Sequence, residues 1–366
     1  MKYFVLAGTR PEIIKIAPII RRLQRLHLDF SFILTGQHYD YELSKQMIID
    51  LDLNLPDVSL NLKSNSPASQ IAEIMSKLEQ IMQDDSARIV ITQGDTNSVL
   101  SSSLTAIKLG IPLVHIEAGL RSYDWRMPEE HNRRMVDHIS NLLCAPTEIA
   151  KRNLEEEKVF GSIFVTGNTV IDAVNEHLPI AESNSKVLES IKISEYILVT
   201  VHRSENVDNI ARLSIIINSL ISSQFNIIFP LHPRTKKRLI EFGLFERIRN
   251  NKSIIIIPPQ GYLDFLILMK NSKFIITDSG GIQEEATAGS ISKRILVLRD
   301  STERPEAISC GAARLIPIQF DKILDQINFE INNIETKTYE CPYGDGDASK
   351  KIIEIVEEEK VNFFKN

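Results

Sequence analysis

Four residues with acid or base side chains lie at or soon after the ends of short apolar segments: Asp95, Glu117, Glu129 and His202. Three carboxylates and an imidazole suffice to take a proton from one face of a substrate and return one to the other. A carboxylate at the end of a buried strand is costly to desolvate, so a fold keeps it for chemistry or for an ion pair. Both interpretations stay open here, because Asp95 could cap a helix and Glu117 could pair with Arg121 or Arg133.

A second group of residues has the chemistry to hold phosphate. The Ser-Gly-Gly run at 279–281 follows the apolar run 274–277, where Asp278 or Ser279 could cap a helix and the glycines would let an anion approach backbone N–H groups. Arg10 and Lys15 follow the first apolar run and could hold a diphosphate. An ordinary capped turn and solvated cations would explain the same residues. The sequence has no Gly-x-Gly-x-x-Gly and no Gly-Lys-Ser/Thr loop, which disfavours a dinucleotide oxidoreductase or a P-loop hydrolase.

Short β-rich apolar runs alternate along the chain with segments of helical period, and together they must position these side chains. Helices are expected in the gaps, including 12–26, 96–109 and one that begins at Pro128. This alternation predicts right-handed βαβ units and parallel sheets covered on both faces, with ligands at the carboxyl ends of the strands. The predicted strands are 3–7, 30–35, 88–92, 112–116, 142–145 and 163–166 in the first half, and 196–201, 226–230, 253–257, 274–277 and 294–298 in the second.

The length of 366 residues fits two domains better than one core. The polar, poorly periodic segment 179–186 is the predicted linker. We predict an N-terminal Rossmann-like domain over 1–170, to which a C-terminal helix at 347–366 returns, and a second Rossmann-like domain over 171–346. The predicted fold class is therefore α/β, with two parallel sheets facing a central cleft.

Composition argues against several classes of function. A net charge of -6 gives no general basic field for nucleic acid or an anionic membrane surface, and no apolar run approaches transmembrane length. The three cysteines are far apart, which disfavours a disulfide framework or a paired-cysteine zinc site. His131 and His138 lack further ligands of suitable spacing, so we expect no metal. The first apolar run is too short for a signal peptide, and we expect a cytoplasmic protein.

Seven motifs occur in an order that resembles the non-hydrolysing UDP-N-acetylglucosamine (UDP-GlcNAc) 2-epimerases, which belong to the two-domain glycosyltransferase-B-like (GT-B-like) superfamily. The motifs are GTRPE at 8–12, QGDT at 93–96, HIEAGLR at 115–121, MPEE at 127–130, HRSEN at 202–206, DSGGIQEE at 278–285 and TERPE at 302–306. The resemblance implies inversion of C2 through anti elimination of UDP to a 2-acetamidoglucal, followed by readdition to give UDP-N-acetylmannosamine (UDP-ManNAc). It also implies a homodimer, a role in polysaccharide biosynthesis and no redox cofactor.

The resemblance also implies roles for individual residues. Its acid and base groups fall on the four residues named at the outset, and it leaves open which of them removes the C2 proton. The implied substrate contacts are Arg10 and Lys15 on diphosphate, Ser279, Gly280 and Gly281 on phosphate, Glu285 on the ribose hydroxyls, Gln260 and Phe265 on uracil, with Arg121, Arg203 and Arg304 also on the substrate. A plain core role for Phe265 is an alternative.

Other activities would use a similar set of residues. The motifs GDTNS at 94–98, RMPEE at 126–130 and LHPRT at 231–235 also resemble 2-epimerases of UDP-2,3-diacetamido sugar acids, whereas TRPE at 9–12 and ERPE at 303–306 favour the UDP-GlcNAc branch. A hydrolysing UDP-GlcNAc 2-epimerase, a glycosyltransferase and a silent UDP-sugar sensor are further alternatives. Retention of all four acid and base residues disfavours the sensor.

Two segments depart from the family pattern. Residues 286–295 form a longer connection than we expect and lack the usual prolines. In bacterial relatives a second UDP-GlcNAc acts as an activator. Gln37 fits the pattern for that activator and Asp40 does not, so we do not expect this activation here.

Overall fold

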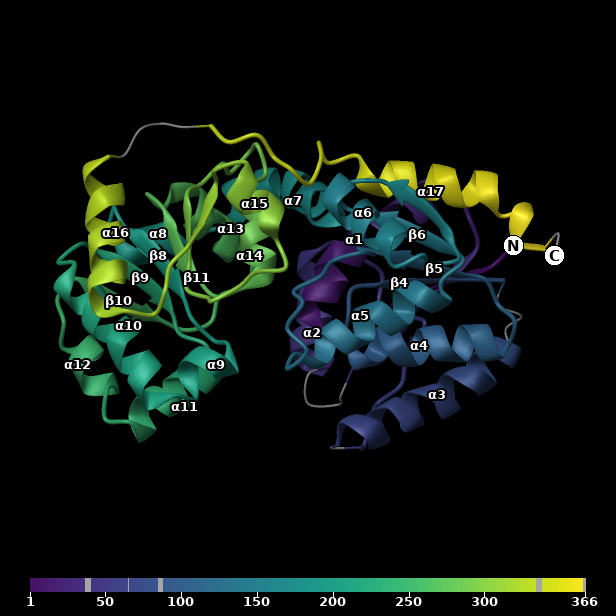
Figure 1. Cartoon of the computed structure of the whole chain (residues 1–366), viewed down its shortest axis with the longest axis horizontal. Helices are drawn as coiled ribbons and strands as arrows, with labels where there is room; N and C mark the ends of the chain where they lie inside the picture. Colours follow the sequence, from purple (N-terminus) through teal and green to yellow (C-terminus); the bar gives the residue numbers. More distant parts are fainter. Residues whose placement is uncertain (37–40, 65, 85–87, 334–337, 365–366) are drawn as a thin grey trace. The chain divides into compact units, whose positions relative to one another are not determined.

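Each half of the chain builds one parallel sheet with helices between its strands. The computed structural model describes residues 1–36, 41–64, 66–84, 88–333 and 338–364. They form two units: unit 1 comprises Met1–Ala173 and Tyr343–Asn366, and unit 2 comprises Val174–Pro342. The predicted α/β class with two parallel sheets is confirmed (Figure 1). Gln37 and Asp40 lie outside the described residues.

Unit 1 has a seven-stranded sheet in the order β3-β2-β1-β4-β5-β6-β7, and the neighbouring strands are parallel. Its strands are β1 (Tyr3–Ala7), β2 (Phe30–Leu34), β3 (Val58–Ser59), β4 (Ile89–Gln93), β5 (Leu113–Ile116), β6 (Leu142–Ala145) and β7 (Ser162–Val165). Its helices are α1 (Arg10–Arg25), α2 (Tyr41–Asp50), α3 (Pro67–Asp84), α4 (Asn97–Lys108), α5 (Pro128–Ile139), α6 (Glu148–Glu156) and α17 (Ala348–Glu359), followed by a 3-10 turn at Asn362–Phe364. Helix α7 (Thr169–Asn184) begins in unit 1 and continues into unit 2.

Unit 2 has a six-stranded parallel sheet in the order β10-β9-β8-β11-β12-β13. Its strands are β8 (Ile197–Thr200), β9 (Ile227–Pro230), β10 (Ile254–Ile257), β11 (Ile275–Thr277), β12 (Ile295–Val297) and β13 (Ala313–Leu315). Its helices are α8 (Val187–Ile191), α9 (Ser204–Val207), α10 (Ile210–Ser222), α11 (Pro233–Glu241), α12 (Phe245–Arg249), α13 (Tyr262–Asn271), α14 (Gly280–Glu285), α15 (Pro305–Ser309) and α16 (Phe320–Asn332). Helices α10 and α16 lie side by side against this sheet (Figure 1).

The strands are apolar because both faces of each sheet are covered. All residues of β1, β4 and β8 are buried, as expected for a parallel sheet between two helical layers. In unit 1, Phe4 and Ile33 of the sheet share a buried cluster with Leu78 and Met82 of α3. Helix α5 begins at Pro128 as predicted, because a proline in the first turn leaves no intrahelical hydrogen bond unmade.

Three elements differ from the sequence prediction. The linker prediction at 179–186 is wrong in its first part, since α7 continues through Pro179 to Asn184. Leu178 and Ala181 are buried on either side of this proline, so packing outweighs the hydrogen bond that proline removes. Strands β3 and β13 were not predicted, because they span only two and three residues and form no recognisable apolar run.

Asp172 of α7 anchors the last helix of the chain. Its carboxylate accepts the backbone N–H of Ser349 at 2.8 Å and that of Ala348 at 3.2 Å, at the first turn of α17. Helix α17 packs against α1 within unit 1. An acidic side chain from another helix therefore caps α17, whose own N-cap residue Asp347 makes no capping bond.

Candidate active site

Side chains from α1, from the end of β4 and from the segment after β7 converge on the carboxylate of Glu117. Glu117 directly follows β5, is buried, and has a φ of 70°, in the left-handed region that non-glycine residues rarely adopt. Its carboxylate accepts hydrogen bonds from Lys15 Nζ on α1 and from Gln93 Nε2 at the end of β4. Asn168 Nδ2 donates to the same carboxylate at 3.2 Å. Glu117 is therefore held by one cation and two amides, and Arg121 and Arg133, the two partners considered for it from the sequence, are engaged elsewhere.

Asp95 lies two residues beyond β4 and pairs with α5. Arg133 Nε lies 2.9 Å and Nη2 2.7 Å from Asp95 Oδ2, while Asn132 Nδ2 donates to the Asp95 carbonyl at 2.9 Å. Glu129 lies half-buried in the first turn of the same helix. Helix α5 thus supplies both the partner of Asp95 and the third predicted carboxylate.

Arg121 does not join the cluster around Glu117. Its guanidinium is buried between Asp137, 2.7 Å away through Nη1, and Glu157, 2.7 Å away through Nη2. Nη1 also donates to the Leu120 carbonyl at 2.8 Å. Arg121 therefore ties the loop after β5 to α5 and to the residue after α6.

Glu12 is a buried carboxylate to which the sequence analysis gave no role. Its Oε2 accepts the N–H groups of Gly8 at 2.6 Å and Thr9 at 2.8 Å, and Thr96 Oγ1 donates to Oε1 at 2.5 Å. Burial outweighs these hydrogen bonds and raises the pKa of Glu12 to about 7. A Cβ added to Gly94 would lie 3.8 Å from Glu117 Oε2 and 3.9 Å from Glu12 Cγ, so the glycine separates two acidic side chains.

Arg10 starts α1 beside these groups. Its Nε atom is buried and has no hydrogen-bond partner among the residues that the structure describes. A buried guanidinium N–H without a partner is costly, so it is suited to an anion that arrives with the ligand.

In unit 2, Asp278 organises the turn that carries His202 and Arg203. The carboxylate of Asp278 accepts the N–H of His202 at 3.0 Å, the N–H of Arg203 at 3.0 Å and Asn206 Nδ2 at 3.0 Å. Ser279 occupies the N-cap of α14, one of the two residues considered from the sequence, but its side chain makes no capping bond, and Asp278 does not cap this helix. The carboxylate of Asp278 can be fully buried because the N–H groups of the turn at 202–206 supply its hydrogen bonds.

The imidazole of His202 is half-buried at this turn. Its Nδ1 lies 3.5 Å from Asp278 Oδ1, and its ring centroid lies 5.5 Å from that of His232. Burial and the charges of Arg203 and Arg234 outweigh the attraction of Asp278 and hold the pKa of His202 below its ordinary value. His202 is therefore a neutral imidazole at neutral pH, able to accept or share a proton.

Three charged side chains lie close to Gly280. A Cβ on this glycine would lie 2.7 Å from Glu303 Oε1, 3.6 Å from Arg304 Cζ and 3.7 Å from Arg203 Nη2. Glu303 pairs with Arg203 at 3.3 Å and with Arg304 at 3.0 Å, and it is the member of this group that sequence reasoning missed. The two arginines are thus gathered beside Gly280 at the start of α14.

Glu285 is the last residue of α14 and is buried. A Cβ added to Gly281 would lie 3.8 Å from Glu285 Oε1. Gln260 precedes α13, where its Nε2 donates to the Pro258 carbonyl at 2.6 Å. Phe265, in the first turn of α13, is half-buried. The structure therefore groups Arg203, Arg304, Glu285 and the glycine turn, with Gln260 and Phe265 on a separate connection.

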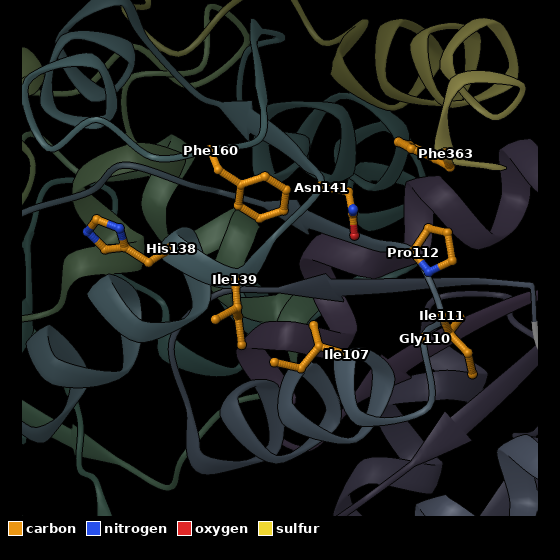
Figure 2. Close-up of a pocket in the computed structure, with 9 residues that line it drawn as sticks. All are labelled: Ile107, Gly110, Ile111, Pro112, His138, Ile139, Asn141, Phe160 and Phe363. Carbon is orange, nitrogen blue, oxygen red and sulfur yellow. The ribbon is translucent and has the colours of Figure 1, made fainter. Parts of the chain in front are cut away.

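A pocket of about 390 Å³ lies elsewhere in unit 1 (Figure 2). It is lined mainly by residues that precede β5, β6 and β7, at the amino ends of the strands, and none of the predicted site residues lines it. Its walls are Ile107, Gly110, Ile111, Pro112, His138, Ile139, Asn141, Phe160 and Phe363. Within the described ranges no group of three or more His, Cys, Asp or Glu side chains could hold a metal ion. None of the helices in those ranges has the length and hydropathy of a membrane span.

Two parallel α/β units with polar turns at the carboxyl ends of their strands define a protein of the GT-B-like class. Comparison with known proteins identifies the family within that class. The profile described as UDP-N-acetylglucosamine 2-epimerase matches residues 21–357. The chain belongs to the UDP-N-acetylglucosamine 2-epimerase family.

Individual relatives match over nearly their whole length. A Methanocaldococcus jannaschii protein named UDP-N-acetylglucosamine 2-epimerase is 43% identical over 365 residues, covering 97% of this chain and 99% of that protein. The crystal structure of Methanocaldococcus jannaschii UDP-GlcNAc 2-epimerase in complex with UDP-GlcNAc and UDP is similar with a TM-score of 0.90 and 43% identity, covering 98% of this chain and 100% of that one. A Pseudomonas aeruginosa protein named UDP-2,3-diacetamido-2,3-dideoxy-D-glucuronate 2-epimerase is 32% identical, covering 97% and 99%.

Proposed function

We propose that this chain is a non-hydrolysing epimerase that inverts C2 of UDP-GlcNAc to give UDP-ManNAc. The observation that carries the proposal is the 43% identity, over the full length, to a protein named for this activity. The relative named for a diacetamido sugar acid is less similar, at 32% identity, which disfavours that substrate.

The proposed reaction breaks and remakes the same bonds. A base removes the C2 proton while the C1–O bond breaks, its electron pair leaves with the diphosphate of UDP, and a C1=C2 double bond forms. UDP then adds back to C1 while an acid delivers a proton to the opposite face of C2. Developing negative charge on the diphosphate and positive character on the sugar both need stabilisation, which cations and carboxylates provide.

Unit 1 supplies the proposed acid and base groups Asp95, Glu117 and Glu129. Glu117 is fixed by Lys15, and Asp95 by Arg133, so their carboxylates are oriented before substrate arrives. Glu129 makes no hydrogen bond or ion pair with any residue that the structure describes, which leaves its carboxyl group available to the sugar. The buried, unpartnered Nε of Arg10 supports a contact with the diphosphate.

Unit 2 supplies the proposed nucleotide contacts and the fourth acid or base, His202. Arg203 and Arg304 converge beside Gly280, where backbone N–H groups of residues 279–281 would also face phosphate. Glu285 would accept the ribose hydroxyls, and Gln260 and Phe265 would hold uracil. Because the pKa of His202 is held below its ordinary value, the imidazole is neutral at neutral pH and can accept a proton.

We further propose a cytoplasmic homodimer that supplies UDP-ManNAc for polysaccharide biosynthesis. The three cysteines are free thiols, which fits a reducing compartment. The dimer and the biosynthetic role rest on the family resemblance. Light scattering of the purified protein tests the dimer, and a mass of one chain would refute it.

Incubation with UDP-GlcNAc in deuterated water tests the reaction. We expect intact UDP-GlcNAc and UDP-ManNAc, both carrying deuterium at C2. Release of free N-acetylmannosamine would instead show a hydrolysing enzyme. Exchange confined to a UDP-2,3-diacetamido sugar acid would move the substrate to that branch, and no exchange with either substrate would refute epimerisation.

Two substitutions test the assigned groups. Glu117→Gln and His202→Ala should keep UDP binding and lose most of the C2 exchange, by about a hundredfold or more if each moves a proton in the reaction. Titration calorimetry with UDP measures the binding, and deuterium incorporation measures the exchange. An unchanged exchange rate in either variant would remove that residue from the chemistry.

A further inference from the structure

His115 of β5 and Asp137 of α5 form a buried pair next to the turn that carries Glu117. Both side chains are fully buried, and His115 Nδ1 lies 2.7 Å from Asp137 Oδ1. The other ring nitrogen, Nε2, lies 2.8 Å from the carbonyl oxygen of Gly94. A carbonyl oxygen only accepts, so Nε2 donates. Arg121, 2.7 Å from Asp137 Oδ2, favours the ionised carboxylate, so Nδ1 donates as well. The ring is therefore an imidazolium held at both nitrogens.

The second oxygen of Asp137 reaches the turn after β5. Oδ2 accepts the N–H of Gly119 at 3.1 Å and lies 2.7 Å from Arg121 Nη1. In this turn Gly119 has a φ of 84° and Glu117 a φ of 70°. A non-glycine residue in the left-handed region persists only where its surroundings hold it there. Asp137 holds this turn two residues beyond Glu117.

Two acidic groups act on His115: Asp137 from helix α5, and Glu117 from the turn that directly follows β5. Each of these carboxylates is also paired with a cation, Asp137 with Arg121 and Glu117 with Lys15. Burial opposes a charged ring, but the hydrogen bond and charge of Asp137, with Glu117, raise the pKa of His115 above its ordinary value. Burial likewise opposes the Asp137 carboxylate, and His115 and Arg121 hold its pKa below the ordinary value.

We propose that His115 and Asp137 are positioning residues for the epimerisation. Through Gly119 the pair keeps Glu117 in its left-handed conformation, and through the Gly94 carbonyl it fixes the distance from Glu117 to the turn that carries Asp95. Both residues are buried, so they act through the backbone and through their charge. The inference rests on the proposed function, because that function makes Glu117 and Asp95 the acid and base groups.

Asp137→Asn removes the charge and retains the shape. The amide oxygen can still accept from Gly119 and Arg121, while the amide nitrogen donates to Nδ1 of a neutral ring that keeps its proton on Nε2. We expect kcat for C2 exchange to fall by about tenfold or more, KM to stay within about twofold, and the pH profile of kcat to shift. His138→Gln, at an exposed position one residue along α5, should leave all three unchanged.

The unaltered protein is assayed first, which separates this inference from the proposed function. No C2 exchange in the unaltered protein would refute the proposed function. Exchange in the unaltered protein, with Asp137→Asn matching its kcat and pH profile, would refute the positioning role alone. A parallel loss of kcat, affinity and thermal stability in Asp137→Asn would also refute it, since a merely structural residue would behave so.

A measurement on the unaltered protein decides the matter if Asp137→Asn fails to fold. NMR of histidine-labelled protein, with His115 assigned by a His115→Gln variant or by its coupling to neighbouring groups, reports whether each ring nitrogen carries a proton. We expect both nitrogens of His115 to carry protons at neutral pH. A neutral ring at neutral pH would overturn the inference.

Discussion

Substitution of Glu12 by glutamine should stabilise the folded protein at high pH. In the folded chain the pKa of this carboxyl is about 7, against an ordinary value of 4.5. Between these two values the folded chain keeps a proton that the unfolded chain has released. The free energy of unfolding therefore falls as pH rises through this interval and changes no further above it.

The magnitude follows from the two pKa values. At about 1.4 kcal/mol per pH unit, the loss between about pH 5 and pH 8.5 is about 2–3 kcal/mol. Glutamine does not titrate, and its amide can fill the same site: the oxygen can accept from Gly8 and Thr9, and the nitrogen can donate to Thr96 Oγ1. The Glu12→Gln variant should lack this loss.

Urea unfolding at a series of pH values measures the effect. The single tryptophan, Trp125, lies in the same unit as Glu12, so its fluorescence reports the relevant transition. Glu73→Gln is the control: the hydrogen bond with Lys77 lowers the pKa of Glu73 to about 2, so its titration ends below the range tested. Equal pH slopes in the unaltered protein and in Glu12→Gln would refute the reasoning.

Two further predictions concern a glycine and a helix cap. Gly280→Ala should weaken UDP binding by about tenfold or more in titration calorimetry, because its Cβ would lie 2.7 Å from Glu303 Oε1. Gly289→Ala, whose Cβ would meet nothing within 4 Å, should bind UDP normally, and equal losses in both variants would contradict the steric argument. Asp172→Ala should speed amide exchange in α17 by an amount equivalent to about 1 kcal/mol, since Ser349 and Ala348 lose their acceptor. Unchanged exchange at these amides would show that the cap is unimportant.

The strands were predictable because burial on both faces turns each into a continuous apolar run, as in β1 and β8. The position of Glu117 after β5 was predictable for the same reason, since it directly follows such a run. The residue that pairs with Glu117 could not be predicted. Lys15 is 102 residues away in the chain, and local patterns carry no signal for which cation a fold will bring to a carboxylate.

The same limit applies to buried charges. Asp137 lies near the end of α5, next to the polar His138, and the sequence offers no sign that it is buried against the residues around Glu117. Glu12 was part of a recognised motif, yet its raised pKa comes from burial, which depends on the packing of the whole unit. Pro179 shows the reverse case, because a residue that usually ends a helix is tolerated where its neighbours are buried.

The return of the chain to unit 1 affects the order of events during synthesis. Unit 2 is one continuous segment, whereas unit 1 needs Tyr343–Asn366, which the ribosome produces after the whole of unit 2. Helix α17 then covers α1, and Glu357 accepts a hydrogen bond from Tyr3 of the first strand. Domains usually fold from the N-terminus as they emerge. Here the unit that is begun first is completed last, so a ribosome-bound chain would carry a finished unit 2 beside an unfinished unit 1.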